Sequence, residues 1–233
     1  NQSQDGDNVI TVVAGTTSST PKVITIAEDQ TWSLKGIPNA YIQCDETSKG
    51  YMWYVKGATL TLEDIVIDGN FYYASVTGKT SPFRVEYDDG EDEPQLSVLN
   101  LRSGAVIRNA SDDGIYAYGG IVNMYDGARI TEIAETEYAI YATGTYVTTT
   151  QIDRSPTVNI YGGEFDHNAR CFYPTGGCKL NIYGGNYHDN VYAGSTGGVI
   201  VNCTSSAAKV AIYGGTFTNN ALTGTGANNV GTI

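Results

Sequence analysis

Three stretches of the sequence repeat one pattern, and this pattern decides the fold. They are Val158-Asn159-Ile160-Tyr161-Gly162-Gly163-Glu164-Phe165-Asp166-His167-Asn168, Leu180-Asn181-Ile182-Tyr183-Gly184-Gly185-Asn186-Tyr187-His188-Asp189-Asn190 and Val210-Ala211-Ile212-Tyr213-Gly214-Gly215-Thr216-Phe217-Thr218-Asn219-Asn220. A period of this size is typical of a solenoid, in which each unit buries its apolar side against its neighbours. We therefore expect one elongated domain over residues 1–233, with function on a stacked surface rather than in one pocket.

Short runs of alternating apolar side chains favour strands over helices. Examples are Leu60-Thr61-Leu62 and Ile65-Val66-Ile67, and no segment keeps a period of 3.6 residues. Aligned on the Gly-Gly pair, the repeat extends back to Val122–Gly127 and Leu99–Gly104, and a third strand follows in each unit. The sequence therefore predicts an all-β solenoid with three strands per coil.

The coils are expected to divide the chain into three parts: a lead-in at 1–20, opening coils at 21–57 and regular coils at 58–233. The regular part also contains three corner loops, at 87–95, 148–156 and 202–209. Insertions gathered on one face of a solenoid often build its binding face.

A polar column accompanies the repeat, five residues after the second glycine of each unit. Its members are Asn109, Glu132, Asn168, Asn190 and Asn220. Asparagine tolerates a left-handed backbone, and its amide both donates and accepts, so a column at strand spacing can hydrogen-bond to itself. We expect Glu132 to interrupt this column, with a local distortion or a salt bridge.

The Gly-Gly units, the stretch from Ala58 to Gly69 and the Asn column together resemble a known fold family. This family is the single-stranded, right-handed parallel β-helix of the pectate-lyase-like superfamily, and the Gly-Gly-rich coils of bacterial surface and adhesin-like proteins are especially similar. The resemblance covers roughly residues 20 to 233. It implies that the Asn column is an internal ladder at a turn. The superfamily includes lyases, hydrolases, adhesins and tailspikes, so the fold does not decide the function.

Charge and composition narrow the classes of partner. The formal charge of −12 comes from 25 acidic and 13 basic residues and repels both nucleic acid and anionic membrane surfaces. No apolar run approaches the roughly 18 to 20 residues that span a bilayer, and no cationic leader is present. The start at Asn1 fits a processed chain that is secreted or displayed at a cell surface. An open parallel edge after the last repeat points to further C-terminal coils or domains, or to a packing partner.

The four cysteines do not form a metal site, because none is closely paired and the chain has only two histidines. Cys171 and Cys178 flank a turn and could bridge, and Cys178 could instead meet Cys203 if the two occupy the same corner of neighbouring coils. The alternatives are therefore one disulfide, by either pairing, or free buried thiols at Cys44 and the other positions.

Two columns of tyrosine are the main binding candidates. The first column is Tyr125, Tyr161, Tyr183 and Tyr213, and the second is Tyr116, Tyr141, Tyr173 and Tyr192. Alternation turns the first column outward, and stacked coils place equivalent residues about 4.8 Å apart. Such stripes either stabilise the solenoid by contacts between neighbouring rings or form a platform for the apolar face of a sugar chain.

The sequence signals for catalytic residues are weaker than those for the tyrosine columns. Asp112 and Asp113 resemble the paired aspartates of polygalacturonase-type hydrolases, but the coils beside them lack the histidine and the Arg-x-Lys of that family, and a turn explains both residues. A calcium-dependent lyase needs stacked carboxylates and a basic residue. His167 and His188 stand at different offsets from the Asn column, so alternation places them on opposite faces.

Calcium is the one cofactor that the sequence offers a place for. The acidic loop contains Asp88, Asp89 and Asp92, which have the oxygen ligands that calcium prefers but not the spacing of a helix-loop-helix site. A solvated loop explains the same residues.

We expect a non-catalytic adhesion or carbohydrate-binding module, secreted or on a cell surface, with a polysaccharide or a surface glycan as its partner. One alternative is a polysaccharide lyase or glycoside hydrolase acting on an acidic plant or host polysaccharide. The other alternative is a purely structural rod.

Overall fold

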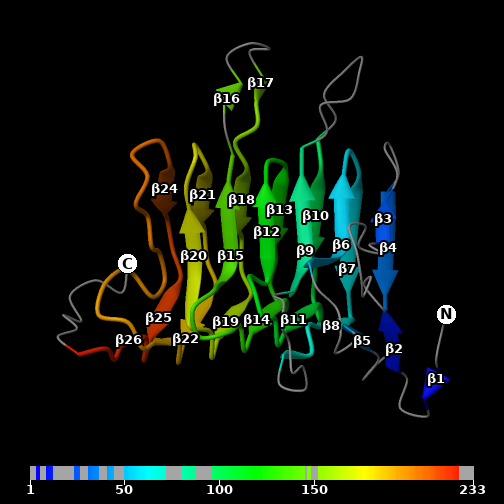
Figure 1. Ribbon diagram of the computed structural model, residues 1–233, viewed down its shortest axis with the longest axis horizontal. Helices are drawn as coiled ribbons and strands as arrows, with labels where there is room; N and C mark the ends of the chain where they lie inside the picture. The colour runs from blue at the N-terminus through cyan, green and yellow to red at the C-terminus, as the bar shows by residue number, and fades with distance from the viewer. Residues whose placement is uncertain are drawn as a thin grey trace.

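The chain forms a parallel β-helix solenoid, shown from the side by the computed structural model in Figure 1. The structure describes residues 4–5, 9–12, 24–26, 31–36, 41–44, 50–71, 80–87, 96–144, 146–147 and 152–225. Within these ranges no α-helix occurs, and strands stack along the long axis from the N-terminal to the C-terminal end. The all-β solenoid predicted from the repeat is confirmed.

Three sheets form the sides of the solenoid, and a regular coil gives one strand to each. The nine-stranded sheet contains β1 (Gln4–Asp5), β2 (Val9–Val12), β5 (Tyr41–Cys44), β8 (Val66–Asp68), β11 (Val106–Arg108), β14 (Arg129–Thr131), β19 (Glu164–Asp166), β22 (Asn186–His188) and β25 (Thr216–Thr218). The seven-stranded sheet contains β4 (Thr31–Lys35), β7 (Thr59–Glu63), β10 (Val98–Leu101), β13 (Ile121–Met124), β18 (Thr157–Ile160), β21 (Lys179–Ile182) and β24 (Lys209–Ile212). The six-stranded sheet contains β3 (Ile24–Ile26), β6 (Gly50–Lys56), β9 (Thr80–Glu86), β12 (Ile115–Tyr118), β15 (Tyr138–Thr143) and β20 (Arg170–Pro174).

Two small sheets complete the described strands. β16 (Tyr146–Val147) and β17 (Ile152–Asp153) pair antiparallel in a hairpin that projects above the coils in Figure 1. β23 (Val191–Tyr192) pairs in parallel with β26 (Ala221–Leu222). The predicted lead-in at 1–20 supplies β1 and β2, and β2 pairs with β5 in the nine-stranded sheet. Of the predicted corner loops, 202–209 is described, while 88–95 and 148–151 lie outside the described residues.

The core forms because the strands keep their register from coil to coil. Leu101, Met124, Ile160 and Ile182 occupy one position of the seven-stranded sheet, and each is fully buried. Alternation sends every second side chain inward, and burying such a side chain contributes about 1.5–3 kcal/mol. The interior is therefore a continuous apolar column rather than a single globular core.

The inward side chains of β24 are more exposed than those of the strand before it. Val210 and Ile212 are 38% and 37% exposed, whereas their register partners Leu180 and Ile182 are 1% and 0% exposed. Among the described residues, β24 is the last strand of the seven-stranded sheet, and its inward positions are less covered than those of β21.

The predicted Asn column is wrong by one residue. Thr131 pairs with Asp166, so the equivalent of Glu132 is His167 and not Asn168. Five positions separate Met124 from Arg129, but only four separate Ile160 from Glu164, although both pairs are in register. The Gly-Gly turn is one residue shorter, which Gly163 permits with a φ of 96°.

The shift separates two columns at this corner. The left-handed positions are Asn109, Glu132, His167, Asp189 and Asn219, with φ between 52° and 57°. Glu132 therefore has the same backbone as its neighbours in the column, and the local distortion expected there does not occur.

The true ladder stands one residue later and contains Asn168, Asn190 and Asn220. The side-chain amide of Asn190 donates to Asn220 Oδ1 at 2.8 Å and to the carbonyl of Phe165 at 2.9 Å, and its Oδ1 accepts the N–H of Asn168 at 3.0 Å. In the coil of Glu132 the ladder place is taken by Ile133, whose N–H donates to Asn168 Oδ1 at 3.2 Å.

A second amide ladder runs along the outer face of the seven-stranded sheet. Asn123, Asn159 and Asn181 each donate from Nδ2 to Oδ1 of the preceding member, at 2.9 Å, beginning with Asn100. None of the four cysteines forms a disulfide: Cys44, Cys171 and Cys178 are buried, and Cys203 is exposed. Of the alternatives for the cysteines, the structure therefore shows the thiols and neither disulfide.

Candidate functional site

The tyrosines of the first column stack ring on ring. Each directly follows the last residue of a strand of the seven-stranded sheet. Ring centroids are 5.1 Å apart for Tyr125 and Tyr161, 5.2 Å for Tyr161 and Tyr183, and 5.0 Å for Tyr183 and Tyr213, with interplanar angles of 19°, 6° and 7°. The guanidinium of Arg102 covers Tyr125 at 4.2 Å. Neighbouring rings therefore cover each other's faces, so that the column presents mainly ring edges and hydroxyls to solvent.

This geometry favours a stabilising role for the first column. A sugar packs its apolar side on the face of an aromatic ring, and the faces of Tyr161 and Tyr183 are occupied by neighbouring rings. Tyr213, the last ring of the stack, is 68% exposed. The structure thus brings the four predicted residues together, but as a stack and not as an open platform.

The second column lies on the outer face of the six-stranded sheet. Tyr116, Tyr141 and Tyr173 are in register, as predicted. Tyr192 is not, because it lies on β23 in a separate sheet. Phe172 instead pairs with Val201, so that Asn202 lies beside Tyr173 in the next coil. That prediction failed because the chain forms β23 and a further turn before it returns to this sheet.

The second column is part of a wider surface, which we call the aromatic face. Its outward residues are Tyr51, Tyr54, Arg84, Tyr116, Tyr118, Tyr141 and Tyr173, and all of them are partly exposed. The rings meet at different tilts: Tyr116 and Tyr141 are T-shaped at 5.2 Å, and Tyr141 and Tyr173 are tilted by 36° at 5.2 Å. Tyr116 also stacks with Tyr51 at 5.9 Å and with Tyr118 at 6.3 Å, and Tyr173 stacks with Tyr138 at 4.9 Å. The aromatic face is therefore a broad cluster of partly exposed rings rather than a single stack.

Arg84 takes the place of a tyrosine in this row and contacts the residues around it. It pairs in register with Tyr54 on one side and Tyr116 on the other. Its guanidinium carbon lies 5.1 Å from the ring centroid of Tyr51, and Nε donates to Glu86 at 2.5 Å. Burial is the main cause that raises the pKa of Tyr116 to about 12, so its hydroxyl stays protonated and able to donate.

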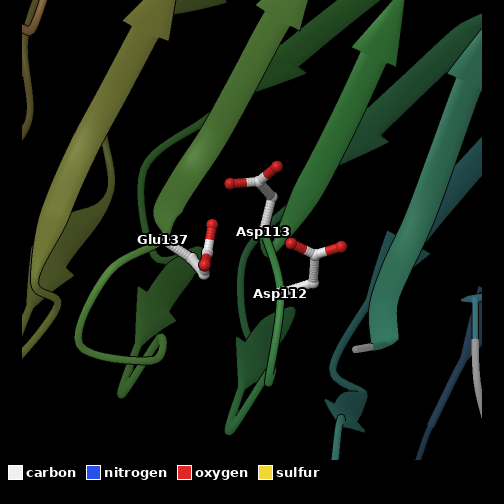
Figure 2. Close-up of side chains that lie close together, drawn as sticks. All are labelled: Asp112, Asp113 and Glu137. Atoms are coloured by element: carbon white, nitrogen blue, oxygen red, sulfur yellow. The ribbon is translucent and has the colours of Figure 1, made fainter. Parts of the chain in front are cut away.

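Three carboxylates lie close together where β12 and β15, two inner strands of the six-stranded sheet, begin (Figure 2). Asp112 and Asp113 precede β12 and Glu137 precedes β15, and one carboxylate oxygen of each lies within 4.8 Å of the others. Asp113 is 4% exposed and accepts the N–H of Tyr138 at 3.0 Å. We call these three residues the acidic cluster.

The acidic cluster includes a residue that the sequence prediction left out. The pair Asp112 and Asp113 was predicted to be a turn, and Glu137 of the next coil completes the group only when the coils stack. Carboxylate oxygens in this arrangement suit a hard cation such as calcium or the hydroxyls of a sugar. The calcium ligands proposed from the sequence, Asp88, Asp89 and Asp92, lie outside the described residues.

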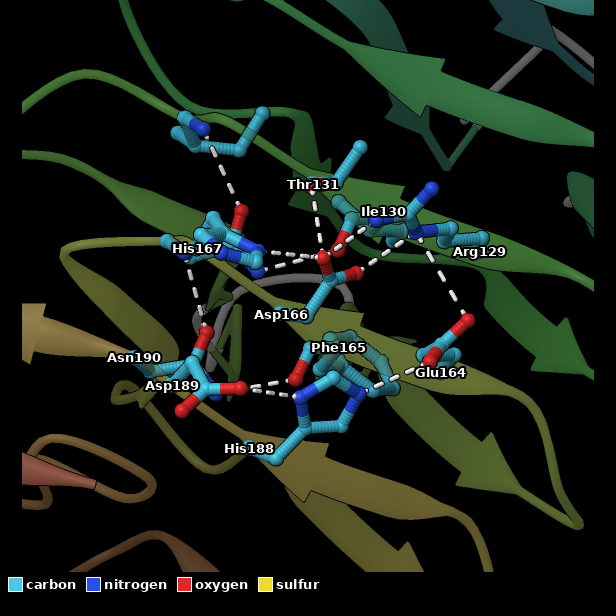
Figure 3. Close-up of polar contacts among 12 residues, drawn as sticks. Arg129, Ile130, Thr131, Glu164, Phe165, Asp166, His167, His188, Asp189 and Asn190 are labelled. Atoms are coloured by element: carbon cyan, nitrogen blue, oxygen red, sulfur yellow. Dashed lines mark hydrogen bonds and ion pairs between the residues drawn. The ribbon is translucent and has the colours of Figure 1, made fainter. Parts of the chain in front are cut away.

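A separate charged network lies on the outer side of the nine-stranded sheet (Figure 3). The side chain of Asp166 is fully buried and accepts from Arg129 Nε at 2.6 Å and from the hydroxyl of Thr131 at 3.2 Å. Its Oδ2 also contacts His167 Nδ1 at 2.6 Å. Burial opposes ionisation, but the bonds from Arg129 and His167 outweigh it and hold the pKa of Asp166 below its usual value.

His188 belongs to the same network and bridges two further carboxylates. Its Nε2 lies 2.7 Å from Glu164 Oε1 and its Nδ1 lies 2.8 Å from Asp189 Oδ2, and these bonds raise the pKa of His188. The prediction that His167 and His188 face opposite sides is wrong. Strand alternation ends at Asp166, and the left-handed backbone of His167 turns its side chain out to the surface.

Among the described residues, no helix has the length and apolar character needed to cross a bilayer. Comparisons of the chain with protein-family profiles, with curated proteins and with solved structures found no match.

Proposed function

We propose that the chain is a non-catalytic carbohydrate-binding protein and that the aromatic face is its binding surface. The observation that carries this proposal is a row of partly exposed side chains that passes the acidic cluster at the starts of β12 and β15. The row consists of Tyr54, Arg84, Tyr116, Tyr141 and Tyr173. Ring faces accept the apolar side of a sugar, phenol hydroxyls donate to it, and carboxylates accept its hydroxyl groups.

The dimensions of the aromatic face fit an extended ligand. Its row crosses five strands, β6, β9, β12, β15 and β20. At about 4.8 Å per strand the row is roughly 19 Å long. A chain of several sugars lying along the solenoid axis therefore contacts successive coils, four of which offer a tyrosine and one of which offers Arg84.

The resemblance to pectate-lyase-like β-helices and to bacterial surface proteins supports a setting for this activity. We propose that the protein acts outside the cell or on its surface, where polysaccharides are the abundant partners. The formal charge of −12 favours neutral or cationic glycans over acidic ones. An acidic polysaccharide requires a bridging cation, and the acidic cluster is the candidate place for calcium.

Removal of single rings tests the proposed surface. After a glycan array has identified a ligand, Tyr116→Ala and Tyr141→Ala are each expected to weaken binding about tenfold in isothermal titration, because each removes a ring face. Tyr161→Ala is the matched control from the first column and should leave the affinity unchanged. Failure of the intact protein to bind any saccharide, or a loss of binding confined to Tyr161→Ala, contradicts the proposal.

A glycoside hydrolase is the second candidate, because the carboxylates of the acidic cluster lie close together. Hydrolases of this kind use two carboxyl groups on either side of the glycosidic bond. This alternative predicts that the intact protein releases new reducing ends from its ligand and that Asp113→Asn abolishes the release. A polysaccharide lyase predicts unsaturated uronate products from an acidic polysaccharide with calcium.

A further inference from the structure

A pocket of about 400 Å³ opens at the corner where the nine-stranded sheet leads into the six-stranded sheet. Phe71 and Val191 give it apolar walls, and Glu132, Glu135 and Asp189 contribute carboxylates. We call it the corner pocket. Glu135 stands two residues before Glu137 of the acidic cluster. The corner pocket therefore lies close to the acidic cluster along the chain.

The backbone explains why charged side chains gather in the corner pocket. Glu132, His167 and Asp189 occupy the same left-handed position in three successive coils, with φ of 57°, 52° and 54°. Equivalent residues of stacked coils are about 4.8 Å apart. The shared geometry points the three side chains out of the corner in a row, and all three line the pocket.

The lining of the corner pocket has three carboxylates and one basic side chain, the imidazole of His167. Among the residues that line it, none is Lys or Arg. Two nearby arginines are engaged elsewhere: Arg129 binds Asp166, and Arg170 lies between the rings of Tyr138 and Tyr192, at 3.9 and 4.2 Å from their centroids. The hydrogen bond from His188 is the main cause that holds the pKa of Asp189 below its usual value, so this carboxylate is ionised.

We infer that the glycan bound by this protein carries free amino groups, and that the corner pocket receives an ammonium group of that glycan. The inference rests on the proposed function and names its ligand class. A uronate is repelled by the carboxylates. A neutral sugar offers them only hydrogen bonds from its hydroxyl groups, whereas an ammonium group adds an opposite charge to its hydrogen bonds with them. Phe71 and Val191 accommodate the carbon skeleton of the same sugar.

A pair of oligosaccharides that differ only in acetylation tests this inference. Titration of the intact protein with a glucosamine oligomer and with the N-acetylglucosamine oligomer of equal length, in a slightly acidic low-salt buffer, is expected to show at least tenfold tighter binding of the amine form. The preference should shrink as salt is raised, because salt screens the attraction between partly exposed charges.

Isosteric variants locate the effect. Glu135→Gln is expected to weaken binding of the amine oligomer several-fold and to leave the N-acetylated oligomer unaffected, since the substitution removes charge but little volume. Asp126→Asn removes an exposed carboxylate outside the corner pocket and is the control for non-specific attraction by an acidic protein. Thermal unfolding of both variants confirms that each is folded.

The possible outcomes separate this inference from the proposed function. Equal affinity for the two oligomers, or equal losses in Glu135→Gln and Asp126→Asn, overturns the amine site and leaves a glycan-binding aromatic face intact. Failure to bind either oligomer also overturns the amine site, and the glycan array then decides the proposed function. Selective loss of amine binding in Glu135→Gln, with normal binding in Asp126→Asn, establishes the site.

Discussion

At the scale of single residues, His188 shows how stacked coils create an interaction that no one repeat contains. Glu164 comes from the preceding coil and Asp189 from the same coil, and the imidazole lies between their carboxylates. Asp166, also from the preceding coil, occupies the same register position as His188. The chemistry of this position therefore changes from a buried carboxylate to an imidazole in one step along the solenoid.

The raised pKa of His188 leads to a prediction about pH. A group whose pKa is higher in the folded protein stabilises it fully below the unfolded value, here 6.5, and this stabilisation is lost as pH rises through the folded value. His188→Gln should therefore destabilise the protein by about 0.5–1 kcal/mol near pH 5.5 and by less near pH 9. Urea unfolding of both proteins at the two pH values measures this. An equal difference at both would show that the ionisation of His188 does not contribute.

At the scale of elements, the two amide ladders differ in burial and therefore in energetic weight. Asn190 is fully buried and serves the N–H of Asn168, the carbonyl of Phe165 and the amide of Asn220. Asn181 lies on the outer face, where water can replace a lost partner. A buried group left without a partner costs more than an exposed one.

Alanine substitutions in the two ladders test this difference. Asn190→Ala is expected to lower the free energy of unfolding by about 2–4 kcal/mol, because it leaves buried backbone groups without partners. Asn181→Ala is the matched control and should cost less than about 1 kcal/mol. Chemical denaturation measures both values. Similar losses for the two variants would mean that the inner ladder has no special role.

The elements also show what a sequence can reveal. Strand alternation is local, so it correctly placed Met124 and Ile160 inside and Tyr161 outside. The length of a turn cannot be read from alternation. Because the Gly-Gly turn before β19 is one residue shorter, His167 and not Asn168 is equivalent to Glu132. The assignment of Tyr192 to the second tyrosine column was wrong because the chain forms β23 there, outside the six-stranded sheet. Only the hydrogen-bonded register shows that Val201 is the neighbour of Phe172.

The candidate site was predicted less completely than the fold, for the same physical reason. Tyr116, Tyr141 and Tyr173 share one repeat position and were found. Arg84 occupies that position in the preceding coil but does not match the tyrosine pattern, and Glu137 meets Asp113 only across the gap between coils. Contacts between coils that are unlike in sequence do not appear as a period.

At the scale of the whole molecule, a solenoid has no single core, and each coil is stabilised by its neighbours. The inner stack of the nine-stranded sheet illustrates this. Tyr187 lies 5.1 Å from Phe165 and 4.8 Å from Phe217, with both pairs stacked at 11°. Phe165 is fully buried, while Phe217, in the end strand β25, is partly exposed.

The position of each ring along the solenoid predicts how far the effect of its removal extends. Phe165→Ala should cost about 3–5 kcal/mol because it leaves a cavity between coils on both sides. Phe217→Ala should cost less than about 2 kcal/mol, because its ring is already partly solvated and has fewer neighbours to lose. Amide hydrogen exchange should show faster exchange after Phe217→Ala in β22 and β25, with β8 and β11 unchanged. Faster exchange spread evenly over every coil would contradict nearest-neighbour stabilisation and would mean that the coils unfold as one unit.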